Sequence, residues 1–352
     1  MRTRLTATHG TWQLLIATVM ALALLSALAA TASAASPTAC RVQNAATGKT
    51  YKALQTAVDA AKPGAHLVVR GVCHGPTVID KDLAIRGVPS ERRGKPILDG
   101  DEKTRVLTVK PKVEASLRGL VIRDGVAPYG IPSGGGITNK GRLTLRDVVL
   151  RDNDSSAFGS AVFNRGVLRT WGRTLIWGSE GYTSGSALYN TGHATLGGMT
   201  RISRNFGCLR NLGVLVMNDS SSIDSCLMYF GADRLWNDGS LVMNDSSSIW
   251  GTGGVWNRGD LTLNDASSIH GNLHKYKEGP GVGGGVVNEG TLTMTGSSSI
   301  HHNEAVSFSG VGMAGRGGGI YHFGVGTLVG VTCGPGANVY GNTPDDCYFE
   351  SP

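Results

Sequence analysis

The chain has 352 residues, with 52 glycines, 40% hydrophobic residues and a formal net charge of +7 at pH 7. For this length the positive charge is mild, and it lacks the dense basic stripe with interleaved aromatic residues that is typical of nucleic-acid binders. We therefore expect no nucleic-acid partner.

The first 34 residues have the layout of a secretory signal peptide. Arg2 and Arg4 precede an apolar stretch over residues 14–30, and Ala-Ser-Ala follows at 32–34. This order predicts export with cleavage, although an uncleaved membrane anchor is the alternative. No later apolar segment could span a bilayer. Without Arg2 and Arg4 the mature chain has 31 basic and 26 acidic residues, a net charge of +5.

Residues 35–63 are predicted to form an N-terminal cap. Within 51–61, Leu54, Ala57, Val58 and Ala61 recur at helical spacing, and Thr50 is placed to cap the start of a helix. Such an amphipathic helix would cover the open end of a sheet-based solenoid, where unpaired strands must be protected.

The main feature of the chain is a repeat of 20 to 31 residues, which is typical of a solenoid. Each repeat contains Asn-x-Gly, with asparagines at Asn139, Asn164, Asn190, Asn211, Asn237, Asn257 and Asn288. Six of them are followed at offset twelve by an isoleucine: Ile176, Ile202, Ile223, Ile249, Ile269 and Ile300. The first repeat has Leu150 one residue early.

The residues around each asparagine favour short strands separated by turns. A glycine-rich approach precedes it, as at 134–136 and 283–285, and an alternating strand such as 290–294 follows it. A leucine-rich repeat has a similar length, but there the asparagine follows a Leu-x-Leu strand, whereas here it comes first. The remaining solution is a parallel β-helix with coils about 4.8 Å apart. Equivalent asparagines would then form a buried, mainly structural, side-chain ladder.

The six cysteines form an even set in a chain bound for an oxidising compartment. Their proximity along the coils favours three local disulfides, although six cysteines allow fifteen connectivities. The favoured pairs are Cys40 with Cys73, Cys208 with Cys226, and Cys333 with Cys347. A metal site is a poor alternative, because no Cys-x-x-Cys spacing occurs.

The helix-then-coils opening and the repeated Gly-Gly-Gly-Ile and Asn-x-Gly-Thr-Leu-Thr phrases resemble a known family. They are similar to secreted right-handed parallel β-helix proteins of the pectin-lyase-like superfamily, particularly those of actinobacteria. A weaker similarity links them to the repeats of chlamydial polymorphic outer membrane proteins. The resemblance implies the right-handed fold but no single activity, because this scaffold hosts lyases, hydrolases, epimerases, adhesins and non-catalytic members.

The insertions between each isoleucine and the next asparagine vary in length, so they should project from one face and border a binding groove. The largest, over 270–287, carries the catalytic candidates His270, Tyr276 and Lys277, and His301 follows one coil later. These side chains could supply the base, acid and cation for β-elimination from a uronate polymer. Solvated turn residues are the favoured alternative, and a metal held by stacked histidines is the least favoured.

The signatures of enzymes in this superfamily are not recognised in the sequence. No Gly-His-Gly occurs, and the Asp-Asp pair lies at 345–346 in the C-terminal cap. Calcium-dependent lyases of the superfamily need acidic residues on successive coils, and the sequence suggests only one acidic turn, at 99–102. No cofactor and no metal are expected.

A second feature suggests binding. The residue before the ladder asparagine is often aromatic and should point outward. The candidate ligand-binding residues in this row are Tyr189, Trp236, Trp256 and Tyr321. Flat rings one coil apart suit the faces of successive sugars, although packing between coils is the alternative.

The sequence therefore predicts an all-β protein: a single-stranded right-handed parallel β-helix over 64–352, with a short N-terminal capping helix and a disulfide-closed C-terminal end. We expect it to be secreted or held at the cell surface. The favoured function is non-catalytic binding of an extended ligand, such as a polysaccharide or cell-wall glycan. The alternative is a polysaccharide-active enzyme, a lyase or glycoside hydrolase, that uses the loops of 270–304.

Overall fold

A computed structural model describes residues 39–90, 94–128, 133–155, 158–181, 186–226, 234–276, 280–307 and 315–350. The chain divides into two units, Met1–Pro37 and Thr38–Pro352, and every described residue belongs to the second. The expected signal peptide at 1–34 lies outside the described residues. Among the described residues, no helix is long and apolar enough to cross a membrane.

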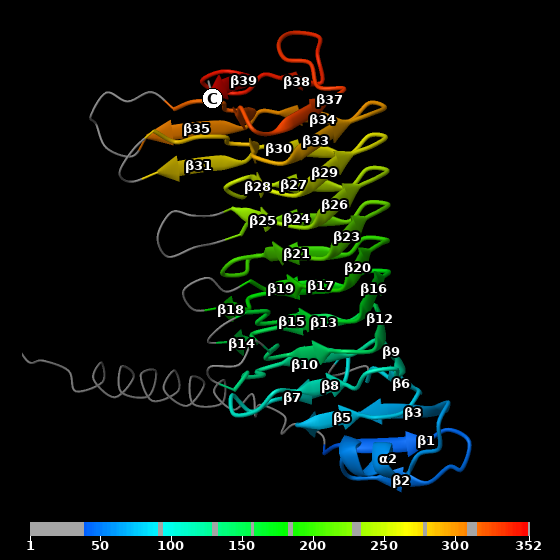
Figure 1. The fold of residues 1–352 in the computed structure, drawn as a ribbon. Helices are drawn as coiled ribbons and strands as arrows, with labels where there is room; N and C mark the ends of the chain where they lie inside the picture. The colour runs from blue at the N-terminus through cyan, green and yellow to red at the C-terminus, as the bar shows by residue number, and fades with distance from the viewer. Residues whose placement is uncertain are drawn as a thin grey trace, which may run out of the picture. The chain divides into compact units, whose positions relative to one another are not determined.

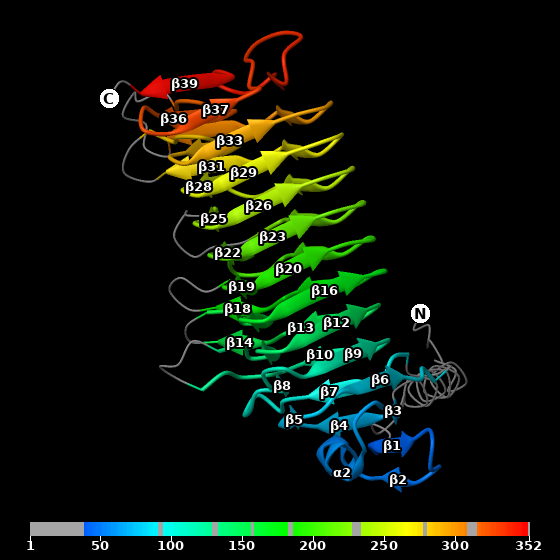
Figure 2. The same ribbon diagram turned by 45° about the vertical axis from the view of Figure 1, so that its right-hand side comes forward.

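Three long sheets make up the second unit, which is a parallel β-helix (Figures 1 and 2). Sheet A contains β4 (Val72–His74), β7 (Ile97–Asp99), β10 (Val121–Arg123), β13 (Val149–Arg151), β17 (Leu175–Trp177), β21 (Arg201–Ser203), β24 (Ser222–Asp224), β27 (Ser248–Trp250), β30 (Ser268–His270), β34 (Ser299–His301) and β38 (Val339–Tyr340). Sheet B contains β2 (Thr50–Tyr51), β1 (Arg41–Asn44), β3 (Ala65–Arg70), β6 (Leu83–Gly87), β9 (Glu114–Arg118), β12 (Arg142–Arg146), β16 (Val167–Trp171), β20 (His193–Leu196), β23 (Val214–Met217), β26 (Ser240–Met243), β29 (Asp260–Leu263), β33 (Thr291–Met294) and β37 (Thr327–Val329). Sheet C contains β5 (Thr77–Ile79), β8 (Leu107–Val109), β11 (Ile137–Asn139), β15 (Val162–Asn164), β19 (Leu188–Asn190), β22 (Leu209–Asn211), β25 (Leu235–Asn237), β28 (Val255–Asn257), β32 (Val286–Asn288), β36 (Ile320–Phe323) and β39 (Cys347–Glu350).

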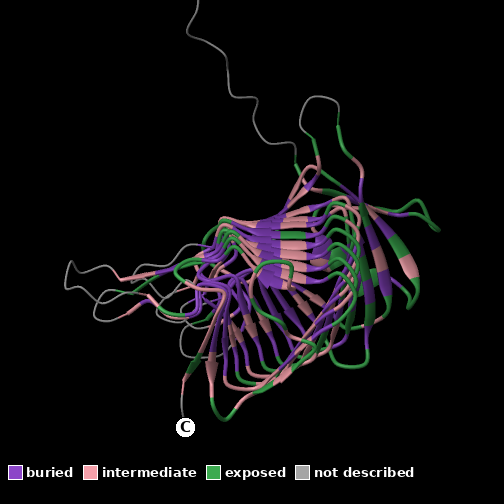
Figure 3. Ribbon diagram, turned by 90° about the horizontal axis from the view of Figure 1, so that it is seen from above, coloured by how far each residue is buried: buried purple, intermediate pink, exposed green. Residues whose placement is uncertain are grey.

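Each repeat runs through sheet C, then sheet B, then sheet A. The Asn-x-Gly turn joins C to B, and the isoleucine at offset twelve is the central residue of a sheet A strand. Leu150 pairs in register with Ile176, so the early leucine of the first repeat occupies the same place. Buried residues alternate with less buried ones along the strands, as the ribbon seen from above shows (Figure 3), and the buried hydrophobic residues form one core.

The predicted asparagine ladder is present between sheets C and B. All seven asparagines are buried, and each of the first six donates its side-chain amide N–H to the side-chain carbonyl oxygen of the next, at 2.7–2.8 Å. His322 takes the place of an eighth asparagine and contacts Asn288 at 3.2 Å through Nδ1. The ladder satisfies amides that would otherwise be costly to bury.

A second ladder follows sheet A, which the sequence analysis missed. From Leu150 onward it uses the residue three places after each central sheet A residue, which is Asn, Ser or Thr in every coil except the one with Cys226. Asn205 Oδ1 accepts from the backbone of Ser179 at 3.0 Å, and Asn303 Oδ1 accepts from Asn272 Nδ2 at 2.9 Å. The mixed residue types hid this periodicity.

The N-terminal cap differs in detail from the expectation. The helix α2 (Leu54–Ala60) is seven residues long and begins after Ala53, without a side-chain cap. Thr50 is not its cap, because this residue belongs to β2 and pairs with Gln43. The helix still buries Leu54, Ala57 and Val58 against the end of the solenoid.

The three predicted disulfides, Cys40–Cys73, Cys208–Cys226 and Cys333–Cys347, are all present. They indicate an oxidising, extracellular environment. At the C-terminal end, the carboxylate of Asp346 accepts from the backbone and side chain of Asn342, and Asp345 accepts from Gly318 N.

The variable insertions leave the solenoid at one place, between sheet A and sheet C, which we call the loop corner. Two additional strand pairs lie there, beside the long sheets in Figure 1: β14 (Asp154–Ser155) with β18 (Glu180–Gly181), and β31 (Leu273–Tyr276) with β35 (Glu304–Ser307). The loop corner is therefore the irregular side of the solenoid, as the variable spacing predicted.

Candidate functional site

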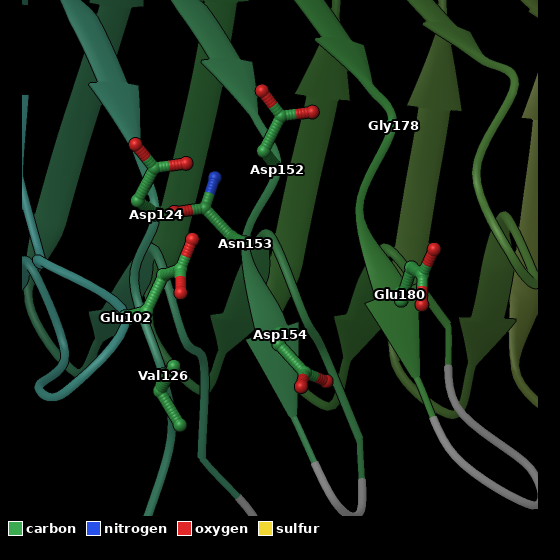
Figure 4. Close-up of a pocket in the computed structure, with 8 residues that line it drawn as sticks. All are labelled: Glu102, Asp124, Val126, Asp152, Asn153, Asp154, Gly178 and Glu180. Atoms are coloured by element: carbon green, nitrogen blue, oxygen red, sulfur yellow. The ribbon is translucent and has the colours of Figure 1, made fainter.

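A hollow lies at the loop corner, in the N-terminal half of the solenoid (Figure 4). Its volume is about 480 Å³, and carboxylates dominate its lining. We call it the acidic groove; its residues are Glu102, Asp124, Val126, Asp152, Asn153, Asp154, Gly178 and Glu180.

Successive coils bring these carboxylates together. Asp124 and Asp152 each directly follow a sheet A strand and turn the backbone with φ of 52°, a left-handed conformation that Asp tolerates better than most residues. Gly178 holds the same place one coil later, with φ of 63°. Asp154 and Glu180 then pair in register on β14 and β18. The groove thus lies between a column of turn residues and a column of strand residues.

Only part of the negative charge is neutralised. Arg123 binds the buried carboxylate of Asp99 at 2.7 Å and approaches Asp124 at 3.2 Å, while Arg151 pairs with Asp152. No Lys or Arg among the described residues forms a salt bridge with the other three carboxylates, those of Glu102, Asp154 and Glu180. The groove is acidic although the whole chain is basic.

The environment raises the pKa of two of these carboxyl groups. Burial is the main cause for Asp124, and the charges of Asp99 and Asp152 add to it, while Arg123 opposes it. Burial also raises the pKa of Asp154, whose Oδ1 atom has no hydrogen-bond partner within the described part of the chain. An incoming hydrogen-bond donor would therefore stabilise both carboxylates.

The acidic groove corrects one expectation from the sequence, which suggested only the local turn at 99–102. Carboxylates do occur on successive coils. They are nevertheless not arranged as a cation site: within the described ranges, no three His, Cys, Asp or Glu side chains are grouped so that they could hold a metal ion.

A smaller hollow of about 310 Å³ lies further along the same corner. Leu273, Lys275, Glu304, Val306 and Ser307 line it, on β31 and β35. Leu273 comes four residues after Ile269, the central residue of β30. Asp154 likewise comes four residues after Leu150, the central residue of β13. The two hollows thus occupy equivalent places on different coils.

The two predicted catalytic histidines lie elsewhere. His270 and His301 are in register on the outer side of sheet A, with ring centroids 5.1 Å apart and planes 4° apart. Trp250 and Tyr340 continue this stack on either side. None of these four residues lines either hollow.

Burial keeps the stacked histidines uncharged at neutral pH. It lowers the pKa of His301 to about 4, with further contributions from His270 and His302. Burial also lowers the pKa of His270. Tyr276 is half exposed at the end of β31, and Lys277 lies outside the described residues. Of the three described candidates, only His270 and His301 are in contact with each other.

The predicted aromatic row lies on the outer side of sheet C, but its ring faces are covered. Trp236 and Trp256 are stacked at 4.6 Å, and the guanidinium of Arg258 lies over both rings, at 5.1 and 4.7 Å. Tyr189 is stacked on Phe163 at 5.3 Å.

Tyr321, the last member of this row, is only 4% exposed and is stacked on Tyr348 at 5.1 Å. Because successive coils stack closely, the aromatic rings of this row pack against the rings of the neighbouring coil. The residues of this row therefore offer ring edges more than ring faces to solvent.

Comparison with known proteins adds no family assignment. No protein-family model matches the chain, and no curated protein or solved structure shows significant similarity to it.

Proposed function

We propose that the protein is an exported β-helix protein of the pectin-lyase-like superfamily that binds an extended glycan at the loop corner without cleaving it. The acidic groove carries this proposal. Its carboxylates come from several coils and follow the solenoid axis, so a chain-like ligand that lies along the axis would contact several of them in turn.

The lining favours a neutral or amine-bearing glycan. Carboxylates accept hydrogen bonds from sugar hydroxyl groups and from ammonium groups, and the unpartnered Oδ1 of Asp154 is an acceptor that such a donor would satisfy. A uronate polymer would bring its own carboxylates against Glu102, Asp152 and Glu180, which is unfavourable. This argues against binding of an acidic polysaccharide in this groove.

The aromatic row of sheet C supports packing between coils more than sugar binding. Sugar rings stack on the faces of aromatic rings, and the faces of Trp236 and Trp256 are occupied by each other and by Arg258. We therefore place the glycan in the acidic groove and assign the row a structural role.

Glycoside hydrolysis is the second candidate, because two carboxyl groups with raised pKa line one hollow. A protonated Asp154 could donate to a glycosidic oxygen, while Asp152 acts as the base or nucleophile. Release of reducing ends that disappears in Asp154→Asn would establish this activity.

Titration calorimetry of residues 35–352 tests the binding proposal. The probes are cellohexaose and chitohexaose as uncharged chains, and hexagalacturonate as the acidic chain. We expect an uncharged hexasaccharide to bind, and Asp152→Asn with Asp154→Asn to weaken it at least about tenfold by removing charged acceptors.

The matched control is Asp219→Asn with Asp245→Asn. These aspartates are exposed turn residues at the corner between sheets B and A, and their φ values of 57° and 56° match the left-handed turn at Asp152. The control should change affinity less than about twofold. Failure of both uncharged probes to bind, or equal loss in the two double variants, would sink the proposal.

A further inference from the structure

The outer surface of sheet B carries a concentrated basic area in the N-terminal half of the solenoid. Figure 2 shows the strands of this sheet side by side across the solenoid. We call this area the arginine face, and define it by Arg86, Arg118, Arg142, Arg146 and Arg169, all exposed on β6, β9, β12 and β16.

Three of these arginines form a column in register. Arg86 pairs with Arg118 across β6 and β9, and Arg118 pairs with Arg146 across β9 and β12. Like charges directly opposite on neighbouring strands destabilise a sheet. Folding alone therefore does not favour this column.

Glu114 lies directly opposite Arg142 across β9 and β12, but little negative charge lies near the column itself to offset the repulsion. Asp147 approaches both Arg118 and Arg146, but only at 3.9 and 3.8 Å, and these two side chains remain 57% and 59% exposed. Among the described residues, no carboxylate forms a salt bridge with Arg86. The guanidinium groups are thus largely free to bind anions from solvent.

The adjoining corner adds a second basic column. Lys110, Lys140 and Arg165 are exposed at equivalent turn positions of three successive coils, where the backbone N–H of Lys140 and of Arg165 each donates to the coil before. In the following coils the same turn position holds Thr191 and then Leu212. The basic area is therefore confined to one part of the solenoid.

Trp171 continues the arginine column on β16, directly opposite Arg146, and its side chain is 45% exposed. A flat ring beside a row of guanidinium groups suits a ligand with both sugar faces and anionic groups. The strands hold the charges about 4.8 Å apart on a rigid sheet, so little ordering is needed on binding.

We propose that the arginine face binds a linear anionic polysaccharide, with carboxylate or sulfate groups along the chain. This site is independent of the acidic groove, which faces a different side of the solenoid and would repel the same polymer. A nucleic acid carries similar charge, but the three disulfides indicate an oxidising, extracellular environment, and the exposed ring of Trp171 beside the column suits a sugar face, so we favour the polysaccharide.

Retention of residues 35–352 on immobilised polygalacturonate and dextran sulfate tests this inference, with uncharged dextran as the reference matrix. We expect retention on the anionic matrices only, and its loss as ionic strength rises from about 0.05 M to about 0.5 M. Comparison of the two anionic matrices distinguishes carboxylate from sulfate recognition.

The decisive variant is Arg86→Thr/Arg118→Thr/Arg146→Thr, because threonine suits an exposed strand. The matched control, Lys49→Thr/Lys52→Thr/Lys62→Thr, removes the same charge from exposed positions at the N-terminal end. The arginine variant should weaken binding at least about tenfold, and the control less than about threefold.

Thermal unfolding separates binding from folding. The arginine variant should be as stable as the wild type or more stable, because it removes like-charge repulsion. Asp152→Asn/Asp154→Asn should leave retention on the anionic matrices unchanged. This inference can therefore fail while the proposed function holds, and the proposed function can fail while this inference holds. Equal losses in the two triple variants, or tighter binding to duplex DNA than to either polysaccharide, would overturn it.

Discussion

Replacing Asn211 by alanine removes the middle of the asparagine ladder. Asn211 Nδ2 donates to Asn237 Oδ1 at 2.8 Å and to Ser240 O at 2.9 Å, and Asn211 Oδ1 accepts from Asn190 Nδ2 at 2.8 Å. The side chain is fully buried, so no water can replace it. Asn237 Oδ1 would lose its donor from the ladder.

The expected cost follows from these contacts. An unsatisfied buried polar group costs about 1–3 kcal/mol, and the small void left by the amide adds to it, so we expect a loss of about 2–4 kcal/mol in the free energy of unfolding. With a urea dependence near 3 kcal/mol per M, the midpoint should fall by about 1 M.

Urea unfolding of Asn211→Ala and Asn218→Ala tests this reasoning. Asn218 belongs to a partly exposed ladder at another corner, where its Oδ1 accepts from Asn244 Nδ2 at 2.8 Å. Water can replace that bond, so the control should lose less than about 1 kcal/mol. A loss below about 0.5 kcal/mol at Asn211, or equal losses at both positions, would refute the account of the ladder.

Three further predictions concern the stacked and cross-linked residues. Because the pKa of His301 is lowered to about 4, the unfolded chain binds a proton that the fold does not between about pH 4 and 6.5. The free energy of unfolding should therefore fall as pH drops through this window, and less steeply in His301→Gln; identical urea profiles at about pH 4.5 and 7 in both proteins would contradict this. Trp236→Leu should lose about 1–2 kcal/mol of stability by unstacking Trp256, without weakening glycan binding, whereas a tenfold loss of affinity in calorimetry would return the site to sheet C. Replacing Cys208 and Cys226 by serine opens a link across 18 residues and should cost about 3 kcal/mol, and an unchanged unfolding curve would show that the link is dispensable.

The solenoid could be predicted from the sequence because one residue type recurs at one place in seven successive coils. Asn164, Asn190 and Asn211 each occupy a buried corner where only an amide both donates and accepts along the axis. The second ladder escaped notice because Ser179 and Asn205 satisfy the same corner with different side chains.

The acidic groove could not be found from the sequence, although all its residues were visible. Asp124 and Asp152 are 28 positions apart, and coils of unequal length obscure that they follow equivalent strands. Conversely, the sequence shows that aromatic residues recur before the ladder position, but it cannot tell whether a ring face such as that of Trp236 is free or covered. Whether a ring face is exposed depends on which side chains the neighbouring coils place against it in the folded protein.

Hydrogen exchange of residues 35–352, with and without a bound uncharged hexasaccharide, tests the central claim most directly. The account predicts slower exchange on binding in the segments of the acidic groove, at 100–104, 122–126, 151–155 and 178–181. Segments 235–237 and 255–257 of sheet C should not change. Protection of the sheet C segments instead, with none in the groove, would contradict the account.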